Sequence, residues 1–313
     1  MKNTIFSKIK KDLKLNKSLY ILVLPVLIFY IIFHYKPMYG AVIAFMDYNP
    51  RLGIKGSEWV GFAQFIRFFN SPYFVRILRN TVLLSVYGII FGFPAPIILA
   101  LLLNELKQKK FKKTVQTATY LTHFISLVVV TGIIKEFTQS TGLINDIIEF
   151  FGGTRTSLIQ NPALYRTIYI TSDIWQEIGW GSIIYLAALS GIDEQLYEAA
   201  SIDGANRWDK LLHVTLPGIS TTIIIMLILR LGQILGSSYE KTILLYNVIY
   251  QTINGHISYE TADVIASYIY RVGILERNWS YSTAIGLFNS GINFIFLLVA
   301  NKLSKKVSET SLW

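Results

Sequence analysis

The chain alternates between long apolar runs and short charged segments, a pattern that predicts helices crossing a lipid bilayer. A helix needs roughly 20 apolar residues to cross about 30 Å of hydrocarbon. Four runs reach this length almost free of charge, within residues 18–35, 81–103, 114–134 and 278–301. Two weaker runs, at about 167–189 and 218–239, complete a predicted all-α fold of six transmembrane helices.

Charged residues interrupt the two weaker runs. Asp173 and Glu177 lie in the first of them, and Arg230 lies in the second. A charge at the centre of a membrane helix costs about 2.5–3.5 kcal/mol on insertion scales. These three residues are therefore candidates for a functional role inside the membrane.

Basic residues are distributed unevenly among the predicted loops. Lysines gather in the first 17 residues, in the loop 107–113 and after residue 301, while the loop after the fourth run adds Arg207 and Lys210. Cytoplasmic loops carry an excess of Lys and Arg, so we expect both termini to be cytoplasmic. The expected organisation is a basic tail at 1–17, a transmembrane domain at 18–301 and a second tail at 302–313.

The composition narrows the possible classes of protein. Of the 313 residues, 15% are charged and 52% are hydrophobic, whereas a soluble domain has about 25% charged residues. No cysteine is present, which excludes disulfides and thiolate metal sites, and the four histidines lack metal-ligand spacing. The net charge of +10 reflects cytoplasmic loops, so we expect a bilayer environment, no metal and no nucleic acid.

Two predicted loops on the opposite side have patterns of their own. Residues 37–79 mix Pro and Gly with aromatic residues, which indicates a folded loop lying on the membrane. Residues 260–273 carry apolar residues at i, i+3, i+4 and i+7, which predicts a short amphipathic helix at the membrane surface.

The usual signatures of enzymes are absent from the sequence. It contains no G-x-x-x-x-G-K-[ST], no H-E-x-x-H and no G-x-S-x-G. We therefore expect no catalytic residues and no ATP site of the phosphate-loop type. Energy for uphill movement of a solute would come from a partner or from an ion gradient.

The most informative segment is the predicted cytoplasmic loop at about 191–217. Asp193 is placed to cap a short helix at about 194–201, and Asp203-Gly204 is a turn signal. A second short helix, at about 205–213, precedes Pro217 at the start of the fifth run. This pattern predicts a helix–turn–helix outside the membrane; the simpler alternative is an interfacial loop with no special role.

The same segment resembles the "EAA" loop of bacterial ABC importer permeases, E-A-A-x3-G-x9-I-x-L-P. The matching residues are Glu198, Ala199, Ala200, Gly204, Leu216 and Pro217, and Val214 stands where the pattern has Ile. Four further stretches are similar to the LplB-type branch of the maltose-permease superfamily, namely YKPMYG at 35–40, GFPAPIILALLLNE at 92–105, YLTHFIS at 120–126 and DVIASYIYRVG at 263–273.

The resemblance implies half of a type I importer in a bacterial cell membrane. Its partners would be a second permease chain, two cytoplasmic ATPase subunits and an external solute-binding protein. ATP and Mg²⁺ would be bound by the ATPase subunits, and this chain would hold no cofactor. The loop would be the coupling helix, with Glu198, Ala199, Ala200, Asp203, Gly204, Arg207, Leu216 and Pro217 as coupling residues.

The LplB-type branch is associated with uptake of oligosaccharides or polysaccharide fragments. A sugar path needs hydroxyl-binding groups and aromatic faces, which the predicted spans offer at Trp175, Gln176, Glu177, Trp180, Arg230, Gln233, Tyr239, Asn289 and Asn293. The alternative is that these groups satisfy one another where helices pack.

Three other functions stay open at this level. The EAA loop also occurs in importers of peptides, ions and amino acids. Asp173 and Glu177 lie one turn apart and could act as a carboxylate pair in a membrane enzyme for lipids or glycans. A proton-coupled carrier would predict inverted repeats, and none is evident.

Overall fold

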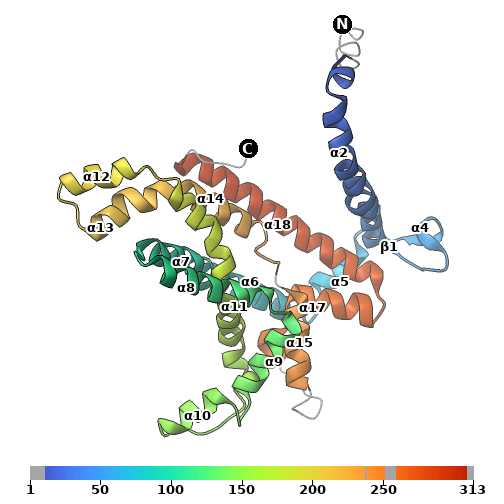
Figure 1. Ribbon diagram of the computed structural model, residues 1–313. Helices are drawn as coiled ribbons and strands as arrows, with labels where there is room; N and C mark the ends of the chain where they lie inside the picture. Colours follow the sequence, from blue (N-terminus) through green and yellow to red (C-terminus); the bar gives the residue numbers. More distant parts are fainter. Residues whose placement is uncertain (1–10, 237, 251–258, 309–313) are drawn as a thin grey trace.

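The computed structural model describes residues 11–236, 238–250 and 259–308, and nearly all of its elements are helices (Figure 1). The first half contains α2 (Lys17–Tyr30), α3 (Lys36–Met38), α4 (Gly53–Gly56), α5 (Ala63–Phe69), α6 (Phe74–Tyr87), α7 (Pro94–Glu105), α8 (Lys109–Leu121), α9 (Leu127–Thr138) and α10 (Leu143–Phe150). The second half contains α11 (Pro162–Ser190), α12 (Glu194–Ile202), α13 (Arg207–Lys210), α14 (Leu216–Leu231), α15 (Tyr239–Tyr250), α16 (Tyr259–Ala262), α17 (Ile265–Tyr270) and α18 (Trp279–Ser308).

Tighter or wider helical turns join several of these helices. Three are 3₁₀ turns, at Tyr39–Phe45, Thr122–Phe124 and Leu158–Gln160. Four are π-helical turns, at Ile31–Tyr35, Gly88–Gly92, Leu211–Thr215 and Arg271–Leu275. Strands β1 (Met46–Asp47) and β2 (Glu58–Trp59) form a small antiparallel pair. The predicted all-α class is therefore confirmed.

Among the described residues, five helical stretches are long and apolar enough to cross a membrane. They are Lys17–Phe45, Phe74–Glu105, Leu127–Phe150, Arg207–Leu231 and Trp279–Lys306. The expected fourth span is α11, whose 29 residues measure about 43 Å at 1.5 Å per residue. This length is enough to cross a membrane, but the polar residues of α11 make it less apolar than the five stretches named above.

The third expected span, at 114–134, is wrong in its boundaries because the helix breaks inside it. Helix α8 ends at Leu121, and Ser126 starts α9, with its hydroxyl accepting from the Val129 amide at 3.5 Å. The apolar stretch that could cross the membrane begins at Leu127. The helix breaks within the YLTHFIS segment at 120–126, and the hydropathy of this segment does not indicate a break.

The fifth expected span, at 218–239, is also shifted. Helix α14 ends at Leu231, turns occupy residues 232–235, and α15 begins at Tyr239. Gly232 permits this end of α14 to approach α18, because a Cβ at Gly232 would lie 2.8 Å from Leu297 Cδ1. Gln233 and Tyr239 therefore follow the membrane helix rather than belong to it.

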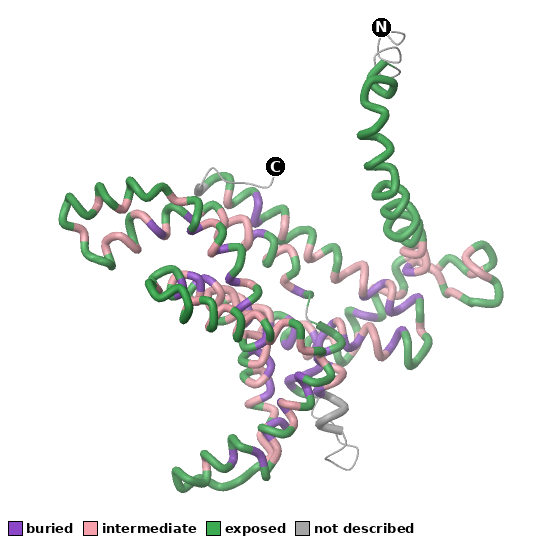
Figure 2. The backbone as a smooth tube through the Cα atoms, viewed as in Figure 1, coloured by how far each residue is buried: buried purple, intermediate pink, exposed green. Residues whose placement is uncertain are grey.

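Helix α11 occupies the centre of the packing. It contacts α7, α8, α14 and α16, and buries a row of residues along its length: Tyr165, Tyr169, Ile170, Gln176, Gly179, Ser182, Tyr185 and Leu189. Figure 2 shows buried positions along this helix and where its neighbours meet it. Gly179 makes the closest approach, since a Cβ there would lie 2.2 Å from the Thr119 carbonyl oxygen.

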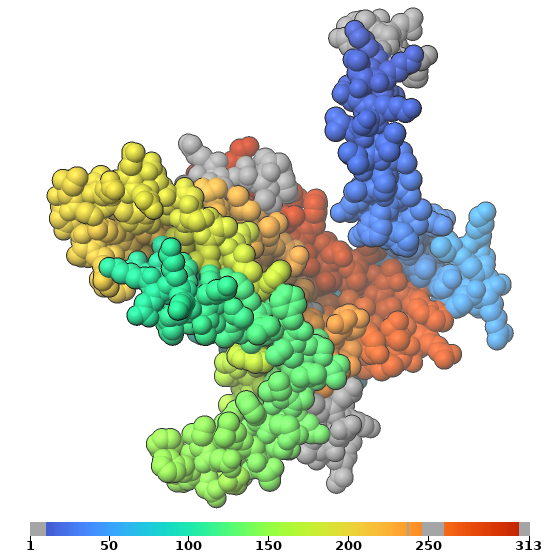
Figure 3. Space-filling view, in the orientation of Figure 1, coloured from blue at the N-terminus to red at the C-terminus, as the bar shows by residue number. Residues whose placement is uncertain are grey.

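Helix α2 stands apart from the rest of the chain, as the space-filling view shows in blue (Figure 3). Within α2, all of which the structure describes, no residue is buried. A helix this apolar cannot face water along its whole length, so lipid or another chain must cover it.

The predictions for the two loops at 37–79 and 260–273 had different outcomes. Residues 37–79 are folded, as expected, into the β1–β2 pair and helices α4 and α5. The amphipathic surface helix expected at 260–273 is wrong, because this segment divides into α16 and α17 and is mostly buried. Asp263 is fully buried there, and its carboxylate accepts from Arg76 and Arg271. The helical spacing of apolar residues predicted a helix at the membrane surface because the sequence does not show that Asp263 pairs with distant arginines and is buried with them.

Candidate functional site

The segment after α11 forms the predicted helix–turn–helix. The Asp193 carboxylate caps α12 by accepting from the Gln195 amide at 3.0 Å. Gly204 has a φ of +80°, a conformation that L residues rarely adopt. Asn206 starts the second arm in a capping box with Asp209. Local sequence signals therefore specify both caps and the turn.

The second arm is longer than expected. It does not end near residue 213 but continues through α13, the π turn and α14 as one helix, Arg207–Leu231. Pro217 is tolerated because it follows the π turn at the start of α14, where a missing N–H costs little. Two side-chain bonds tie the arms together: Lys210 Nζ donates to Ser201 Oγ at 2.7 Å, and the Tyr197 and Thr215 hydroxyls lie 3.0 Å apart.

The tip of this hairpin exposes two large apolar side chains. Ile202 is 87% exposed and Trp208 is 71% exposed. Sequence reasoning missed both, although large apolar residues in a loop between two membrane spans are a usable signal of a protein contact. The predicted coupling residues lie around them. Glu198, Ala199, Asp203, Gly204, Arg207 and Pro217 are exposed, whereas Ala200 and Leu216 are half-buried.

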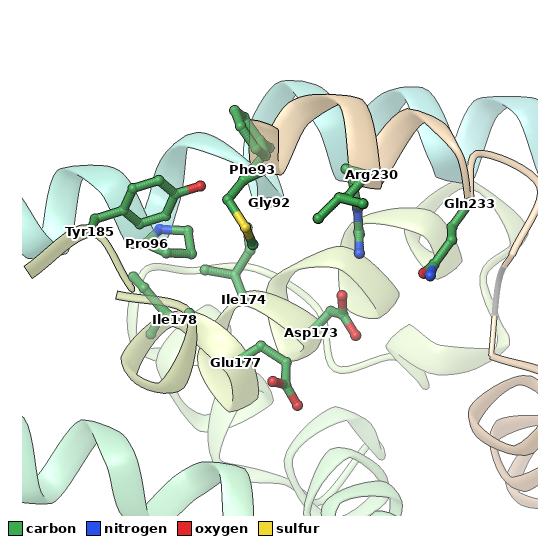
Figure 4. A pocket seen from close by; sticks show the side chains of 13 residues that line it. Gly92, Phe93, Pro96, Asp173, Ile174, Glu177, Ile178, Tyr185, Arg230 and Gln233 are labelled. Carbon is green, nitrogen blue, oxygen red and sulfur yellow. The ribbon is translucent and has the colours of Figure 1, made fainter. Parts of the chain in front are cut away.

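A polar pocket of about 440 Å³ lies at the far end of the same long helix (Figure 4). Helix α11 contributes Asp173 and Glu177, and the α14 end contributes Arg230 and Gln233. The remaining lining comes from apolar residues and glycines of α7, of the two residues just before it, and of α11 and α14: Gly92, Phe93, Pro96, Ile174, Ile178, Gly181, Tyr185, Met226 and Leu229. Three of the nine predicted path residues, Glu177, Arg230 and Gln233, thus meet in one pocket.

Arg230 faces a second, smaller cavity as well. This cavity of about 170 Å³ shares Asp173, Arg230 and Gln233 with the first. Gly88 leaves room for the arginine, because a Cβ at Gly88 would lie 3.3 Å from Arg230 Nη2. Among the described residues, no ion pair or hydrogen bond involves the Arg230 guanidinium.

Lys241, near the start of α15, supplies a buried cation beside the pocket. Its side chain is only 2% exposed. The Nζ atom donates to the Tyr169 carbonyl at 3.1 Å, pairs with Asp173 Oδ1 at 3.3 Å and lies 4.5 Å from the centre of the Tyr169 ring. No local pattern distinguishes this lysine from a solvated one, because its partners lie about 70 residues away.

A second group of polar contacts joins the break between α8 and α9 to α11. The Thr122 hydroxyl donates to the Gln176 carbonyl at 3.0 Å, and Gln176 Nε2 donates to the Ile125 carbonyl at 3.2 Å. His123 Nδ1 lies 2.9 Å from Glu177 Oε2. The His123 ring stacks on Trp180 with centroids 4.6 Å apart. Gln176 and Trp180 therefore hold the break in place.

The other predicted path residues lie elsewhere. Trp175 lines an apolar groove on another face of α11, with Val129 and Ile133. Tyr239 stacks on Tyr270 with centroids 5.8 Å apart. On α18, Asn293 Oδ1 accepts from the Leu235 amide at 2.9 Å. The Oδ1 atom of Asn289 is buried without a hydrogen-bond partner among the described residues.

Asp173 and Glu177 do not form an isolated carboxylate pair. Asp173 is engaged by Lys241, and Glu177 is engaged by His123. Each carboxylate thus has a different basic partner on a different segment. This arrangement does not favour the alternative of a membrane enzyme that uses the two acids together.

Comparisons with known proteins show the family of this chain. Residues 73–309 match the family described as "Binding-protein-dependent transport system inner membrane component". The chain belongs to this family.

Two relatives from Bacillus subtilis resemble this family member over almost its whole length. The polygalacturonan/rhamnogalacturonan transport system permease protein YteP is 44% identical, over 95% of this chain and 91% of the relative. Protein LplB is 43% identical, over 96% of this chain and 92% of the relative.

Solved structures of a bacterial ABC transporter for the acidic polysaccharide alginate are also similar. One matches with a TM-score of 0.85 at 42% identity and covers 96% of this chain and 99% of the other. A second, solved with a periplasmic protein bound to an alginate pentasaccharide, has a TM-score of 0.86 at 41% identity and the same coverage. The type I ABC importer permease fold implied by the sequence resemblance is therefore confirmed.

Proposed function

We propose that this chain is the transmembrane permease subunit of an ATP-driven importer of oligosaccharides or polysaccharide fragments. A single feature carries the proposal: the continuous helix Arg207–Leu231 joins the exposed loop to the polar pocket. Its 25 residues span about 37 Å. A rigid helix of this length converts a push on the loop into movement beside Arg230.

The loop docks on a cytoplasmic ATPase subunit. Ile202 and Trp208 supply the apolar contact, while Glu198, Asp203 and Arg207 fix its register by polar contacts. The bonds from Lys210 to Ser201 and from Tyr197 to Thr215 keep the two arms together as the ATPase moves. This chain holds no nucleotide or metal; ATP and Mg²⁺ belong to the ATPase subunits.

The complete importer contains this chain, a second permease chain, two ATPase subunits and an extracytoplasmic solute-binding protein. Both termini and the coupling loop face the cytoplasm, in line with the distribution of lysines. The pocket formed by Asp173, Glu177, Arg230 and Gln233 lines this chain's side of the path. A relative named for polygalacturonan and rhamnogalacturonan and a structural neighbour that imports alginate support a polysaccharide fragment as the cargo.

Substitution of Gly204 tests the coupling role. No atom lies within 4 Å of a Cβ placed there, so the damage is strain of the backbone at φ +80°. A side chain in this region costs about 1–2 kcal/mol. We expect Gly204→Val to abolish uptake with normal amounts of protein in the membrane, and Gly204→Ala to reduce uptake partially.

Gly191→Ala is the matched control, because Gly191 precedes α12 with an ordinary φ of −90°. The readouts are uptake, retention of the ATPase subunits on purification, and stimulation of ATP hydrolysis by the loaded binding protein. Normal uptake by Gly204→Val with the ATPase still attached would remove the coupling assignment, and with it the proposed function.

A further inference from the structure

A separate polar pocket, of about 580 Å³, lies at the N-terminal end of α18. Segments from four parts of the chain meet there: the end of α5, the start of α6, helix α17 with the turn after it, and α18. Its lining combines three arginines with three tyrosines, namely Arg67, Arg76, Arg271, Tyr73, Tyr268 and Tyr281. This pocket shares no residue with the pocket around Arg230.

Each arginine of this Arg–Tyr pocket lies over a tyrosine ring. The Cζ atom of Arg67 is 4.4 Å from the centre of the Tyr281 ring. The corresponding distances are 5.0 Å for Arg76 over Tyr73 and 5.1 Å for Arg271 over Tyr268. Stacking holds the plane of a guanidinium, and in Arg67 the N–H edges stay available, which is the geometry that binds a carboxylate with two parallel hydrogen bonds.

The fully buried carboxylate of Asp263 supports two of these arginines from behind. Its Oδ2 accepts from Arg271 Nη2 at 2.8 Å and from Arg76 Nη2 at 3.2 Å, and its Oδ1 accepts from Ser267 Oγ at 3.1 Å. Arg76 Nε is buried and has no acceptor among the described residues. Arg76 and Arg271 are therefore positioned before any ligand arrives.

Arg67 has no such carboxylate. It is exposed, and no ion pair or hydrogen bond of its guanidinium occurs within the described part of the chain. Glu276 is the one acidic residue in the lining. Three guanidinium groups thus face two carboxylates, Asp263 and Glu276, and the pocket keeps a net positive charge.

The pocket opens at the end of the molecule opposite the coupling loop. Helix α14 runs antiparallel to α18, because Leu235, just past its end, bonds Asn293, whereas its start lies toward the C-terminal end of α18. The coupling loop therefore lies near the C-terminal end of α18, and the Arg–Tyr pocket lies at its other end, about 45 Å away for 30 residues. Substrate reaches an importer from this side.

We propose that the Arg–Tyr pocket binds a carboxylate-bearing sugar residue of an acidic polysaccharide fragment as it enters the permease. This inference rests on the proposed function and names the class of substrate. Arg67 binds the carboxylate, while Asn70, Ser71 and the tyrosine hydroxyls bind sugar hydroxyls. The volume falls within the range of small-molecule sites, about 300–1,000 Å³.

Binding of trigalacturonate to the complete transporter in nanodiscs, without the binding protein, tests the proposal. Neutral galactotriose serves as the comparison ligand. We expect Arg67→Gln to raise the Kd for trigalacturonate about tenfold or more, because a hydrogen-bonded charge pair is lost. Arg51→Gln is the matched control, since Arg51 is an exposed arginine in the same loop and lies outside the pocket.

A second variant separates binding from folding. Tyr281→Phe keeps the ring under Arg67 and removes the hydroxyl, which lies 3.4 Å from the Tyr268 hydroxyl, and we expect a rise in Kd of about threefold. The thermal midpoint of Arg67→Gln should match that of the wild type, and Tyr281→Phe should lower it slightly because the contact with the Tyr268 hydroxyl is lost. Equal affinity of Arg67→Gln and wild type for trigalacturonate would overturn the proposal, as would equal affinity of the wild type for galactotriose.

One further outcome would reassign the pocket. If Arg67→Gln binds trigalacturonate normally but loses stimulation of ATP hydrolysis by the binding protein, the sugar site is wrong and the arginines dock an acidic face of that protein. The proposed function stands in this case, because stimulated ATP hydrolysis by the wild type is measured in the same preparation. Absence of that stimulation in the wild type would instead remove the proposed function.

Discussion

Helices α2 and α11 are opposite in composition and opposite in surroundings. Helix α2 is a nearly pure apolar run, yet none of its residues is buried within the chain. Helix α11 carries Asp173, Gln176 and Glu177 and fails as an apolar span, yet it buries eight residues at the centre of the fold. The more hydrophobic helix thus packs least against its own chain.

The difference follows from the solvent. In a bilayer, lipid tails are as apolar as leucine, so apolarity places a helix in the membrane without attracting it to other helices. Small residues and polar side chains supply that attraction, through close approach at Gly179 and through the bonds of Gln176 and Asp173. Polarity within a span therefore marks the helix around which the others assemble.

The largest expected effect is at Gly179. A Cβ there would lie 2.2 Å from the Thr119 carbonyl oxygen, and backbone cannot move aside as a side chain can. We expect Gly179→Val to cost about 3 kcal/mol or more and to reduce folded protein severely in detergent size-exclusion profiles. Gly132→Val in α9 is the control, because no atom lies within 4 Å of a Cβ there. Similar losses from both changes would contradict the close packing of α11.

A smaller loss is expected when Lys241 loses its partner. Asp173→Asn leaves the buried ammonium without a countercharge and should lower the free energy of unfolding by about 2 kcal/mol, because the Asp173 side chain is 38% exposed and water screens part of the pair. The double variant Asp173→Asn with Lys241→Met should recover much of that loss, as measured by thermal unfolding of the purified chain. Strictly additive effects of the two changes would show that the pair does not interact.

The Gln176 side-chain amide is one of the groups that hold the break in the third span. Gln176→Leu removes the bond to the Ile125 carbonyl and leaves that carbonyl unpaired, a loss of about 1–2 kcal/mol. Hydrogen–deuterium exchange should rise around residues 122–126 and stay unchanged in α18. Unchanged exchange in that segment would mean that Thr122 and His123 hold the break without Gln176.

The smallest effect is expected in α2. Leu22 is 73% exposed, so Leu22→Ala should change the stability of the isolated chain by less than about 0.5 kcal/mol. A loss of 2 kcal/mol or more, the usual order for a buried leucine, would erase the contrast between the two helices. A larger loss only in the assembled transporter would show that the second permease chain, rather than lipid, covers this face.

The sequence alone determined the features that depend on neighbouring residues. Apolar runs predicted the membrane helices, Asp193 and Gly204 predicted the cap and the turn, and the EAA pattern predicted the family. Local physical chemistry decides each of these. A cap, a positive φ or a membrane-length run needs no distant partner to be recognised.

Only the tertiary structure decided how distant segments meet. It broke the third span at residues 122–126, buried Lys241 beside Asp173, and brought three of the nine predicted path residues into one pocket while Trp175 faces elsewhere. It also gathered Arg67, Arg76 and Arg271 around tyrosines from separate parts of the chain. The physical reason is that hydropathy reports the cost of leaving water, whereas the partner that satisfies a buried charge or an open carbonyl lies tens of residues away.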